Sequence, residues 1–394
     1  MTYRELFRTN PTVKKLAAIQ LVAYFGAWFS NVAIYTLLVK LGASPFIISC
    51  VVAMHFIPGI ILSPFSGPIV DKIEAKRLMI FLMCIELLMT MCFLLINTLD
   101  QVWMLLLFIF IRMSAASMFF TVEMTLMPKL LSGDMLAKAN EIHSIIWSFT
   151  FTAGMALGGI VVNILGIKAA FVLDGLFFIT AILLVISTHF EYEHIVVKQK
   201  ILASIKEGIQ YIKENKHLFH FILLHASVGM TAFDSLVTLL ADFHYKYVIA
   251  VPLAIGLTNA TRSLALMIGP FFITHWVNRQ NIFYIFLFQG IATMIWGLIQ
   301  SDFYFGLIGS FLTGFVTTTL WSHTYADLQE RVDKQYLGRV LAYNEMFFML
   351  SMALTTFFIG FMASYVTLNT ITILLGMGFI CVAIYYKKVL SLDI

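Results

Sequence analysis

Charged side chains are scarce in this chain of 394 residues: Asp, Glu, Lys and Arg make up 12% of it, while 60% of the residues are hydrophobic. A soluble domain of this length carries far more charge on its surface, so a soluble globular fold is excluded. Apolar stretches of the roughly 20 residues that a helix needs to cross a bilayer recur along the sequence. They are continuous and do not alternate, which argues against a transmembrane β-barrel. The sequence therefore predicts an all-α membrane protein.

Signals of other functions are also missing. The nucleotide-binding pattern G-x-x-x-x-G-K-[ST], the metalloprotease pattern H-E-x-x-H and the nucleophile elbow G-x-S-x-G do not occur. The four cysteines lie within apolar stretches, so we expect free thiols and no disulfides. There is no tight cluster of His, Met and Cys, and the basic residues lie in short loops. We therefore expect no enzyme, no cofactor, no metal site and no binding of nucleic acid.

Twelve apolar stretches are predicted to cross the membrane as helices. Turn-forming residues mark their ends, for example Ser132-Gly133-Asp134 and Val251-Pro252. The first stretch follows a basic segment and has no small-residue cleavage site after it, so we expect a permanent helix and no cleaved signal peptide. The predicted spans cover residues 16–39, 46–70, 78–97, 102–127, 140–165, 169–190, 218–241, 253–276, 282–300, 303–326, 339–366 and 369–387.

Basic residues are distributed unevenly between the two sides of these spans. With the N-terminus inside, the cytoplasmic segments hold 20 of the 25 Lys and Arg residues. Because positive charge accumulates on the cytoplasmic side, we expect both termini to lie in the cytoplasm.

The longest polar stretch divides the chain into two halves. Within it, Ile201, Ile205, Ile209 and Ile212 follow helical spacing, which predicts an amphipathic linker helix. We expect one six-helix bundle at residues 1–190, a cytoplasmic linker at 191–217 and a second six-helix bundle at 218–394. The halves also echo each other: Met135-Leu136-Ala137-Lys138-Ala139 parallels Tyr336-Leu337-Gly338-Arg339-Val340, and Asp71-Lys72 parallels Asn278-Arg279. Parallel repeats are typical of transporters that bind their substrate between the halves.

The segment after the second span carries the most specific motif. The run from Gly67 through Asp71 and Lys72 to Arg77 resembles the loop 2–3 motif of the major facilitator superfamily, and the resemblance extends along nearly the whole chain. It implies two pseudo-symmetric six-helix bundles and secondary transport by alternating access. It assigns these four residues to conformational gating, in which Gly67 would permit close helix approach and the charges would hold the cytoplasmic ends together.

Shorter matches indicate a branch of this superfamily. Residues 154–159 resemble the glycine-rich motif of exporters without its usual proline, and Phe108 to Ala116, centred on Arg112, is similar to the span-four motif of proton-linked drug antiporters. Residues 139–141 and 337–341 are similar to macrolide-efflux proteins and the enterobactin exporter. The resemblance implies a monomer in a bacterial inner membrane that uses the proton gradient to export an amphipathic small molecule, such as an antibiotic, a dye or a siderophore.

In this superfamily, spans one, four, seven and ten line the central cavity. The sequence places polar and aromatic side chains on one face of each of these spans, and lipid would leave the polar ones without hydrogen bonds. Packing between helices, with internally bonded hydroxyls, is the alternative for any single Ser or Thr. The candidates for the substrate cavity are Tyr24, Trp28, Asn31, Tyr35, Phe119, Thr231, Thr238, Thr313, Thr317 and Trp321.

Ionisable residues within the spans are candidates for proton coupling. A charge near the bilayer centre costs at least ~2.5 kcal/mol, so depth along the helices predicts the ion pairs Glu86–Arg112 and Asp234–Arg262. Each pair is either a static strut or a switch in which the carboxylate alternates between the arginine and a proton. Asp234 is the first candidate for the proton site, followed by Glu123 and Glu345. Histidines within the spans, His225 among them, are expected to be structural.

Other functions remain open at this point. A lysophospholipid carrier and a carrier of metal ions or metal chelates are alternatives within the transporter class; the 21 methionines and the neighbours Met54 and His55 favour the latter. A non-transporting membrane sensor or enzyme is the alternative from another class, and its activity would persist in detergent without a gradient.

Overall fold

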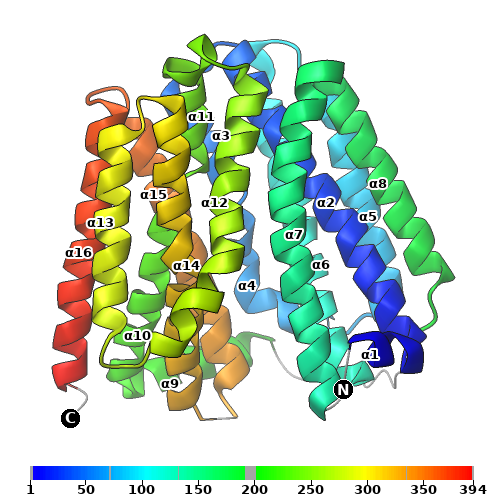
Figure 1. The fold of residues 1–394 in the computed structure, drawn as a ribbon. Coiled ribbons are helices and arrows are strands. Elements are labelled where there is room, and N and C mark those ends of the chain that lie inside the picture. Colours follow the sequence, from blue (N-terminus) through cyan, green and yellow to red (C-terminus); the bar gives the residue numbers. More distant parts are fainter. Residues whose placement is uncertain (1–2, 71, 132, 191–200, 334, 393–394) are drawn as a thin grey trace.

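The computed structural model describes residues 3–70, 72–131, 133–190, 201–333 and 335–392. Throughout these ranges the regular structure is helical, and the helices stand side by side with both ends of the chain at the same side of the molecule (Figure 1). Twelve helical segments are long and apolar enough to cross a membrane, in the order predicted. The prediction of twelve spans is confirmed.

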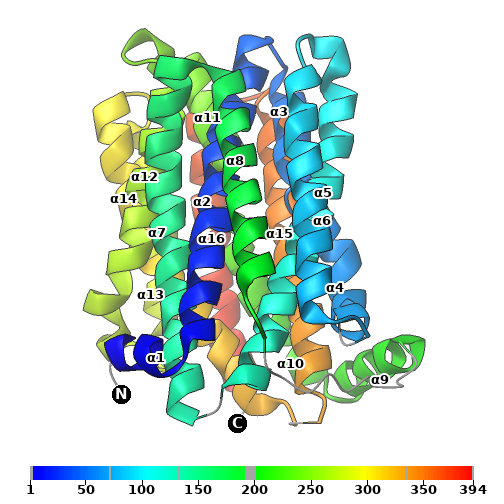
Figure 2. The ribbon, with the colours of Figure 1, turned by 90° about the vertical axis from the view of Figure 1, so that its right-hand side faces the viewer.

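The N-terminal half begins with a short helix that lies across the bundle axis in Figure 2. The helices of this half are α1 (Tyr3–Thr9), α2 (Pro11–Lys40), α3 (Pro45–Ala53), α4 (Ile57–Val70), α5 (Ala75–Cys92), α6 (Val102–Leu130), α7 (Gly133–Leu165) and α8 (Ile167–Ser187). Together α3 and α4 form one span, interrupted at residues 54–56. Pro58 follows this break, and its ring nitrogen cannot donate the helical hydrogen bond to Met54.

The C-terminal half repeats this arrangement. Its helices are α9 (Ile201–Glu214), α10 (Lys216–Ser227), α11 (Asp234–Phe243), α12 (Val251–Ile273), α13 (Ile282–Ile299), α14 (Phe303–Arg331), α15 (Leu337–Met362) and α16 (Leu368–Leu392). The seventh span is broken between α10 and α11 by a 3-10 turn, Val228–Thr231. Gly229 lies in this turn because a Cβ there would come within 2.8 Å of the Phe348 carbonyl oxygen on α15.

Two pairs of equivalent spans are related by the same distance along the chain. Helices α6 and α14 each contain 29 residues, and both their first and their last residues lie 201 positions apart. The same shift relates the starts of α8 and α16, Ile167 and Leu368. Residues of spans four and six can therefore be compared with those 201 positions later, whereas the distance is larger for some other spans, for example 207 between the starts of α5 and α13, Ala75 and Ile282.

Three hydrophobic clusters form the core, and their positions define the state of the molecule. One cluster contains residues of both halves, among them Leu38, Val162, Tyr245 and Leu368, and lies at the end away from the termini. At the end that carries the termini there are two separate clusters. One is built from α1, α2, α4 to α8 and their neighbours, and the other from α9, α10 and α13 to α16 and their neighbours. The bundles therefore share one core at the far end and have separate cores at the end with the termini, where α4 of the N-terminal half still packs on α15 of the C-terminal half.

The seam between the bundles is formed where α7 crosses α12. A Cβ on Gly159 would lie 2.6 Å from the Pro252 carbonyl oxygen, and one on Gly256 would lie 2.6 Å from that of Met155. Only glycine permits backbones to approach this closely. Nearby, the Ser263 hydroxyl donates to the Thr152 hydroxyl oxygen at 2.9 Å. The glycine-rich segment predicted from the sequence thus forms a contact between the halves.

The linker contains the predicted helix, α9, which packs on α15. Arg339 and Glu207 form an ion pair at 2.8 Å, and the Tyr343 hydroxyl donates to the Ile205 carbonyl oxygen at 2.9 Å. Residues 191–200 of the linker lie outside the described ranges, and the domain boundaries at 190 and 218 stay predictions.

Candidate functional site

Arg112 of α6 has a carboxylate partner that the sequence analysis missed. Its side chain is 3% exposed, and its Nη2 donates to Asp174 Oδ2 on α8 at 2.8 Å. The guanidinium carbon also lies 5.6 Å from the ring centre of Phe93 and 5.5 Å from that of Phe178. Because Asp174 is fully buried as well, this is an ion pair inside the protein and not one on its surface.

The predicted pair Glu86–Arg112 is therefore wrong. Glu86 of α5 is buried near Arg112 and Asp174, but the described part of the chain gives it no ion pair within 4 Å. Depth alone could not distinguish Asp174 from Glu86, since Asp174 follows the start of α8 at Ile167 by seven residues, about 10 Å at 1.5 Å per residue. Arg112 lies about 15 Å along α6 by the same measure.

Asp174 joins three spans. The Ser30 hydroxyl of α2 donates to its Oδ2, the oxygen that also accepts from Arg112. A Cβ on Gly26 would overlap Asp174 Oδ1, so the glycine provides the space for this carboxylate. Among the described residues Oδ1 has no hydrogen-bond partner. One carboxylate oxygen is thus occupied twice, and the other is able to accept a proton.

A second buried carboxyl group belongs to Glu123 of α6. The Tyr24 hydroxyl of α2 donates to its Oε2, while Oε1 has no partner within the described ranges. Tyr24 stands edge-on to His143 of α7 at 5.9 Å between ring centres, and His143 also lies 5.7 Å from Phe120. The sequence placed Tyr24 and Glu123 in the cavity and coupling sets separately, and the structure brings them into direct contact.

The equivalent place in the C-terminal bundle holds a different pair. His225 lies 201 positions after Tyr24, and Thr324 lies 201 positions after Glu123. His225 Nδ1 and Thr324 Oγ1 are 2.9 Å apart, and His225 Nε2 has no partner in the parts of the chain that are described. The expectation that His225 is purely structural rested on treating it as a single residue, without its equivalence to Tyr24.

Aromatic rings surround both pairs. In the N-terminal bundle Trp28 stacks on Phe151 at 4.3 Å and stands edge-on to Trp147 at 5.7 Å. In the C-terminal bundle, rings of α14 and α15 surround His225: Trp321 at 5.5 Å, Tyr325 at 5.3 Å and Phe348 at 5.3 Å.

Two aromatic residues near the polar pairs, Phe120 and Trp321, occupy equivalent positions and are partly exposed. Phe120 is 46% exposed and Trp321, 201 positions later, is 37% exposed. Each bundle thus presents an aromatic side chain next to a buried polar pair.

Three further candidates for the substrate cavity are buried: Asn31 and Tyr35 of α2 and Phe119 of α6. Asn31 Oδ1 lies 3.2 Å from His55 Nε2 and can accept a hydrogen bond from it, and the ring of Tyr35 lies 6.0 Å from that of His55. Phe119 packs in the N-terminal core. Their roles in substrate binding stay predictions.

Arg262 of α12 differs from Arg112 in its partner. Its Nη2 donates to the Thr231 carbonyl oxygen at 2.5 Å, and its guanidinium carbon lies 5.1 Å from the Phe233 ring. Asp234 is the first residue of α11, and no ion pair within 4 Å joins it to Arg262 in the described ranges. The predicted direct pair is wrong because the break at residues 228–233 turns a backbone carbonyl towards the guanidinium.

The threonine candidates are bonded within the C-terminal bundle. Thr231 and Thr238 donate to the carbonyl oxygens of Val228 and Asp234 at 2.9 and 2.8 Å. Thr313 donates to the Ser310 carbonyl at 2.8 Å, and Thr317 donates to Gln289 Oε1 on α13 at 3.0 Å. Glu345 is half-buried on α15. Contact of these residues with substrate stays a prediction.

The predicted gating segment is described in part, since Asp71 lies outside the described residues. No described atom lies within 4 Å of a Cβ built on Gly67, so the expected close helix approach at this glycine is not formed. Lys72 is exposed, and Arg77 pairs with Glu74 at 2.8 Å. Lys76 donates to the carbonyl oxygens of Ile186 and Thr188 at the end of α8, 2.7 Å each.

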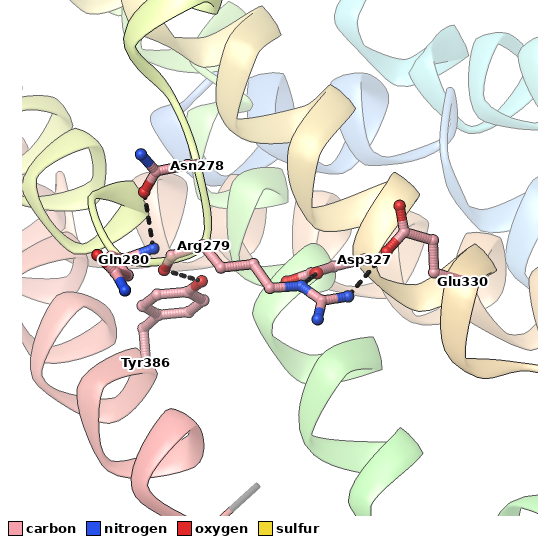
Figure 3. Close-up of polar contacts among 6 residues, drawn as sticks. All are labelled: Asn278, Arg279, Gln280, Asp327, Glu330 and Tyr386. Carbon is pink, nitrogen blue, oxygen red and sulfur yellow. Dashed lines mark hydrogen bonds and ion pairs between the residues drawn. The ribbon is translucent and has the colours of Figure 1, made fainter. Parts of the chain in front are cut away.

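The counterpart after span eight is an ionic cluster, drawn in Figure 3. Arg279 reaches from the loop before α13 to α14, where its Nε donates to Asp327 Oδ1 at 2.6 Å and its Nη2 to Glu330 Oε2 at 2.8 Å. The Tyr386 hydroxyl of α16 donates to the Arg279 carbonyl oxygen at 2.8 Å. The cluster ties the ends of α13, α14 and α16 together.

Comparison with known proteins gives consistent results for sequence and fold. The profile described as Major Facilitator Superfamily matches residues 16–300. Macrolide efflux protein A of Streptococcus pyogenes is 22% identical over 378 residues, which cover 93% of this chain and 92% of that protein. The uncharacterised MFS-type transporter YfiS of Bacillus subtilis is 27% identical over 216 residues, about half of each chain (53% and 51%).

Solved structures show the same architecture. The nucleoside transporter NupG superimposes with a TM-score of 0.75 at 13% identity, covering 97% of this chain and 99% of that one. An auto-inhibited peptide transporter of the POT family gives a TM-score of 0.76 at 9% identity, covering 97% of both chains. At such low identity the likeness concerns the fold alone.

Proposed function

This chain belongs to the Major Facilitator Superfamily and is a secondary transporter of the membrane, and we propose that it exports an amphipathic small molecule in exchange for protons. The family consists of transporters and not of enzymes, which agrees with the sequence analysis. The direction of transport, the cargo and the coupling to protons are the proposal.

The observation that carries the proposal is the pair of equivalent polar sites, Tyr24–Glu123 and His225–Thr324. They lie on spans one and four and on spans seven and ten, and each has one buried polar atom without a partner among the described residues. A buried polar atom without a hydrogen bond costs about 1–3 kcal/mol, so both sites gain stability from a ligand or a proton. Substrate sites of transporters with repeated halves lie between the repeats near the middle of the membrane.

The state of the molecule supports loading from the side of the termini. The bundles share one core at the far end and have separate cores at the end with the termini. We propose that this end faces the cytoplasm of a bacterial cell and that the chain lies in the inner membrane, because the excess of basic residues favours that orientation. A cytoplasmic cargo would then enter between the bundles and leave after they rock.

The cargo is proposed to be bulky, partly apolar and basic or neutral. Phe120 and Trp321 offer aromatic faces, and Glu123 offers a carboxyl group next to them. Macrolides fit this description, and macrolide efflux protein A is similar over 93% of this chain. The described residues contain no group of three possible metal ligands, so the metal-carrier alternative gains no support.

Proton coupling is proposed to use Asp174 and Glu123, with Asp234 retained from the sequence analysis. In the state described here Arg112 binds Asp174 directly. If rocking of the bundles moves α6 against α8, the carboxylate loses its cation and takes up a proton from the outer side at Oδ1. Return of the arginine would release that proton to the cytoplasm, so one proton enters for each outward cycle.

Inverted membrane vesicles test the function. With the interior acidified, erythromycin should accumulate in vesicles that contain the chain, and its addition should dissipate part of the pH gradient. Accumulation that does not respond to collapse of the gradient would contradict antiport. Lysophosphatidylethanolamine as a second probe tests the lysolipid alternative.

Variants of single carboxyl groups test the coupling sites. Asp174→Asn and Glu123→Gln should each reduce gradient-driven uptake at least tenfold. Asp242→Asn is the matched control, because Asp242 binds Lys246 at the far end of α11 and should transport normally. If Asp174→Asn keeps full coupling while Asp234→Asn loses it, Asp234 is the proton site and the role given to Asp174 is wrong.

A further inference from the structure

A laterally open groove of about 500 Å³ lies on the outside of the N-terminal bundle, and none of the residues of the polar pairs described above lines it. Helices α4 and α5 form its walls, and α6 forms its floor. Its lining residues are apolar or small except for one arginine: Ile69, Ile73, Arg77, Leu78, Phe81, Leu82, Ile85, Ile111, Ser114, Ala115 and Met118.

The groove follows from the way the three helices pack. Helices α4 and α5 both lie against α6 but make little direct contact with each other. On the floor between them, Ser114 and Ala115 are too small to fill the space, and the Ser114 hydroxyl is bonded to the Phe110 carbonyl oxygen at 2.8 Å. Phe81 is 62% exposed on the wall, so the groove opens towards the lipid phase.

The C-terminal bundle has a phenylalanine at the position equivalent to Ser114. Phe315 lies 201 positions after Ser114, and its ring is 6.0 Å from that of Phe272 on α12. Gly269 of α12 also lies directly against the backbone of Phe315, which brings α12 onto α14. The N-terminal bundle therefore leaves open a space that the same architecture can close with one phenylalanine.

The single charge of the groove lies at its end near the chain termini. Arg77 lines the groove there, and Glu74 contacts its Nε at 2.8 Å. Lys72, five residues before it, is also exposed. A guanidinium group can bind phosphate through two parallel hydrogen bonds, and basic pockets between membrane helices on the cytoplasmic side bind anionic head groups.

We propose that this groove binds one acyl chain of an anionic phospholipid from the leaflet on the side of the termini, with the lipid phosphate at Arg77. The lining is apolar along the groove and basic at one end. The occupant therefore needs a long apolar tail and an anionic group at one end. A bilayer supplies such molecules at high local concentration. The site would place a lipid head group on the segment predicted to gate the transporter.

The experiment uses the full chain purified in detergent, with phosphatidylglycerol and phosphatidylcholine as probes. Native mass spectrometry counts bound lipids, and thermal unfolding measures stabilisation by each lipid. We expect one tightly held phosphatidylglycerol and at least tenfold weaker binding of phosphatidylcholine. Ser114→Phe, which copies the C-terminal bundle, should weaken phosphatidylglycerol binding at least tenfold.

Three further variants keep the proposal falsifiable. Leu107→Phe adds a ring to an exposed position of the same helix and should bind lipid normally. Ala115→Leu fills the floor of the groove if Ser114→Phe does not fold. Arg77→Gln should remove the preference for phosphatidylglycerol over phosphatidylcholine.

Several outcomes would overturn the assignment. Unchanged phosphatidylglycerol binding in both groove-filling variants would exclude the groove as the site. Equal binding of the two lipids by the unmodified chain would exclude the phosphate contact. Displacement of phosphatidylglycerol by erythromycin would identify the groove as part of the cargo path.

Discussion

The two bundles have the same backbone plan and different polar interiors. At equivalent positions, the N-terminal bundle holds a tyrosine bonded to a carboxyl group, Tyr24–Glu123, and the C-terminal bundle holds an imidazole next to a hydroxyl, His225–Thr324. The C-terminal pair contains no carboxyl group. The comparison teaches that the repeated architecture fixes where a polar pair lies, while the residue types decide whether that pair can carry an anion.

The buried arginines of the two bundles also differ, because only the N-terminal one binds a carboxylate among the residues that the structure describes. Arg112 binds the side chain of Asp174, whereas Arg262 binds the backbone carbonyl of Thr231. A carboxylate can exchange its arginine for a proton, and a carbonyl cannot. This asymmetry supports the proposal that proton coupling belongs mainly to the N-terminal bundle, and four predictions can break or sharpen it.

Loss of either buried arginine should give the largest effects. Arg112→Leu leaves a buried carboxylate without its cation and should lower the free energy of unfolding by about 3–5 kcal/mol. Arg262→Leu removes a hydrogen bond from a charged group to a carbonyl and should cost about 1.5–3 kcal/mol. Denaturant unfolding in detergent micelles measures both.

A double variant controls this result. Arg112→Leu with Asp174→Leu replaces both charges and should recover most of the lost stability, because no unpaired charge remains. Equal losses for the two single arginine variants would remove the distinction between the bundles.

Loss of the hydrogen bond within each polar pair should also lower the free energy of unfolding by different amounts in the two bundles, and this difference should be smaller than that between the arginine variants. Tyr24→Phe removes a hydrogen bond to a carboxyl group and should cost about 1.5–3 kcal/mol, whereas Thr324→Val removes a neutral one and should cost about 1 kcal/mol. The same unfolding measurement applies. A larger loss for Thr324→Val would mean that the C-terminal pair is the charged one.

The exposed aromatic residues should affect cargo binding and leave folding intact. Burial of the exposed part of each ring against an apolar cargo should contribute about 0.7–1.5 kcal/mol, so Phe120→Ala and Trp321→Ala should each weaken erythromycin binding by about 3-fold to 12-fold. Equilibrium binding of radiolabelled erythromycin measures this. Normal binding by both variants would place the cargo elsewhere.

The ionic contacts at the ends of the bundles should give the smallest effects. Arg279→Ala breaks contacts to Asp327 and Glu330 and should lower stability by about 0.2–1 kcal/mol. Arg77→Ala removes a contact between two well-exposed side chains and should not change stability measurably. A clear loss for Arg77→Ala would show that its segment has a structural role.

Much of the fold could be predicted because each membrane span is specified by consecutive residues. About 20 apolar residues in sequence fix a helix, and turn-forming residues fix its ends, so all twelve spans were found. The pairing of buried charges was predicted less well. Depth matched Arg112 to Glu86, but Asp174 lies at a similar depth on another span, and sequence alone does not say which helix is the neighbour.

Backbone irregularity was a second limit. The break before Asp234 separates residues that a continuous helix would have placed on one face, so the span-seven stripe and its pair with Arg262 could not be inferred correctly. The likeness of Tyr24 to His225 was visible only after the helices had fixed the shift of 201 residues between spans four and ten.

A membrane protein of twelve helices in two related halves could be predicted from the sequence, because the lengths of the apolar stretches, the distribution of basic residues and the repeated motifs are all recognisable in consecutive residues. Only the tertiary structure decided which side chains meet: Arg112 with Asp174, Tyr24 with Glu123, and an open groove where the other bundle has Phe315. The two polar contacts join residues 62 and 99 positions apart, and they depend on helix packing, which a local sequence pattern does not specify.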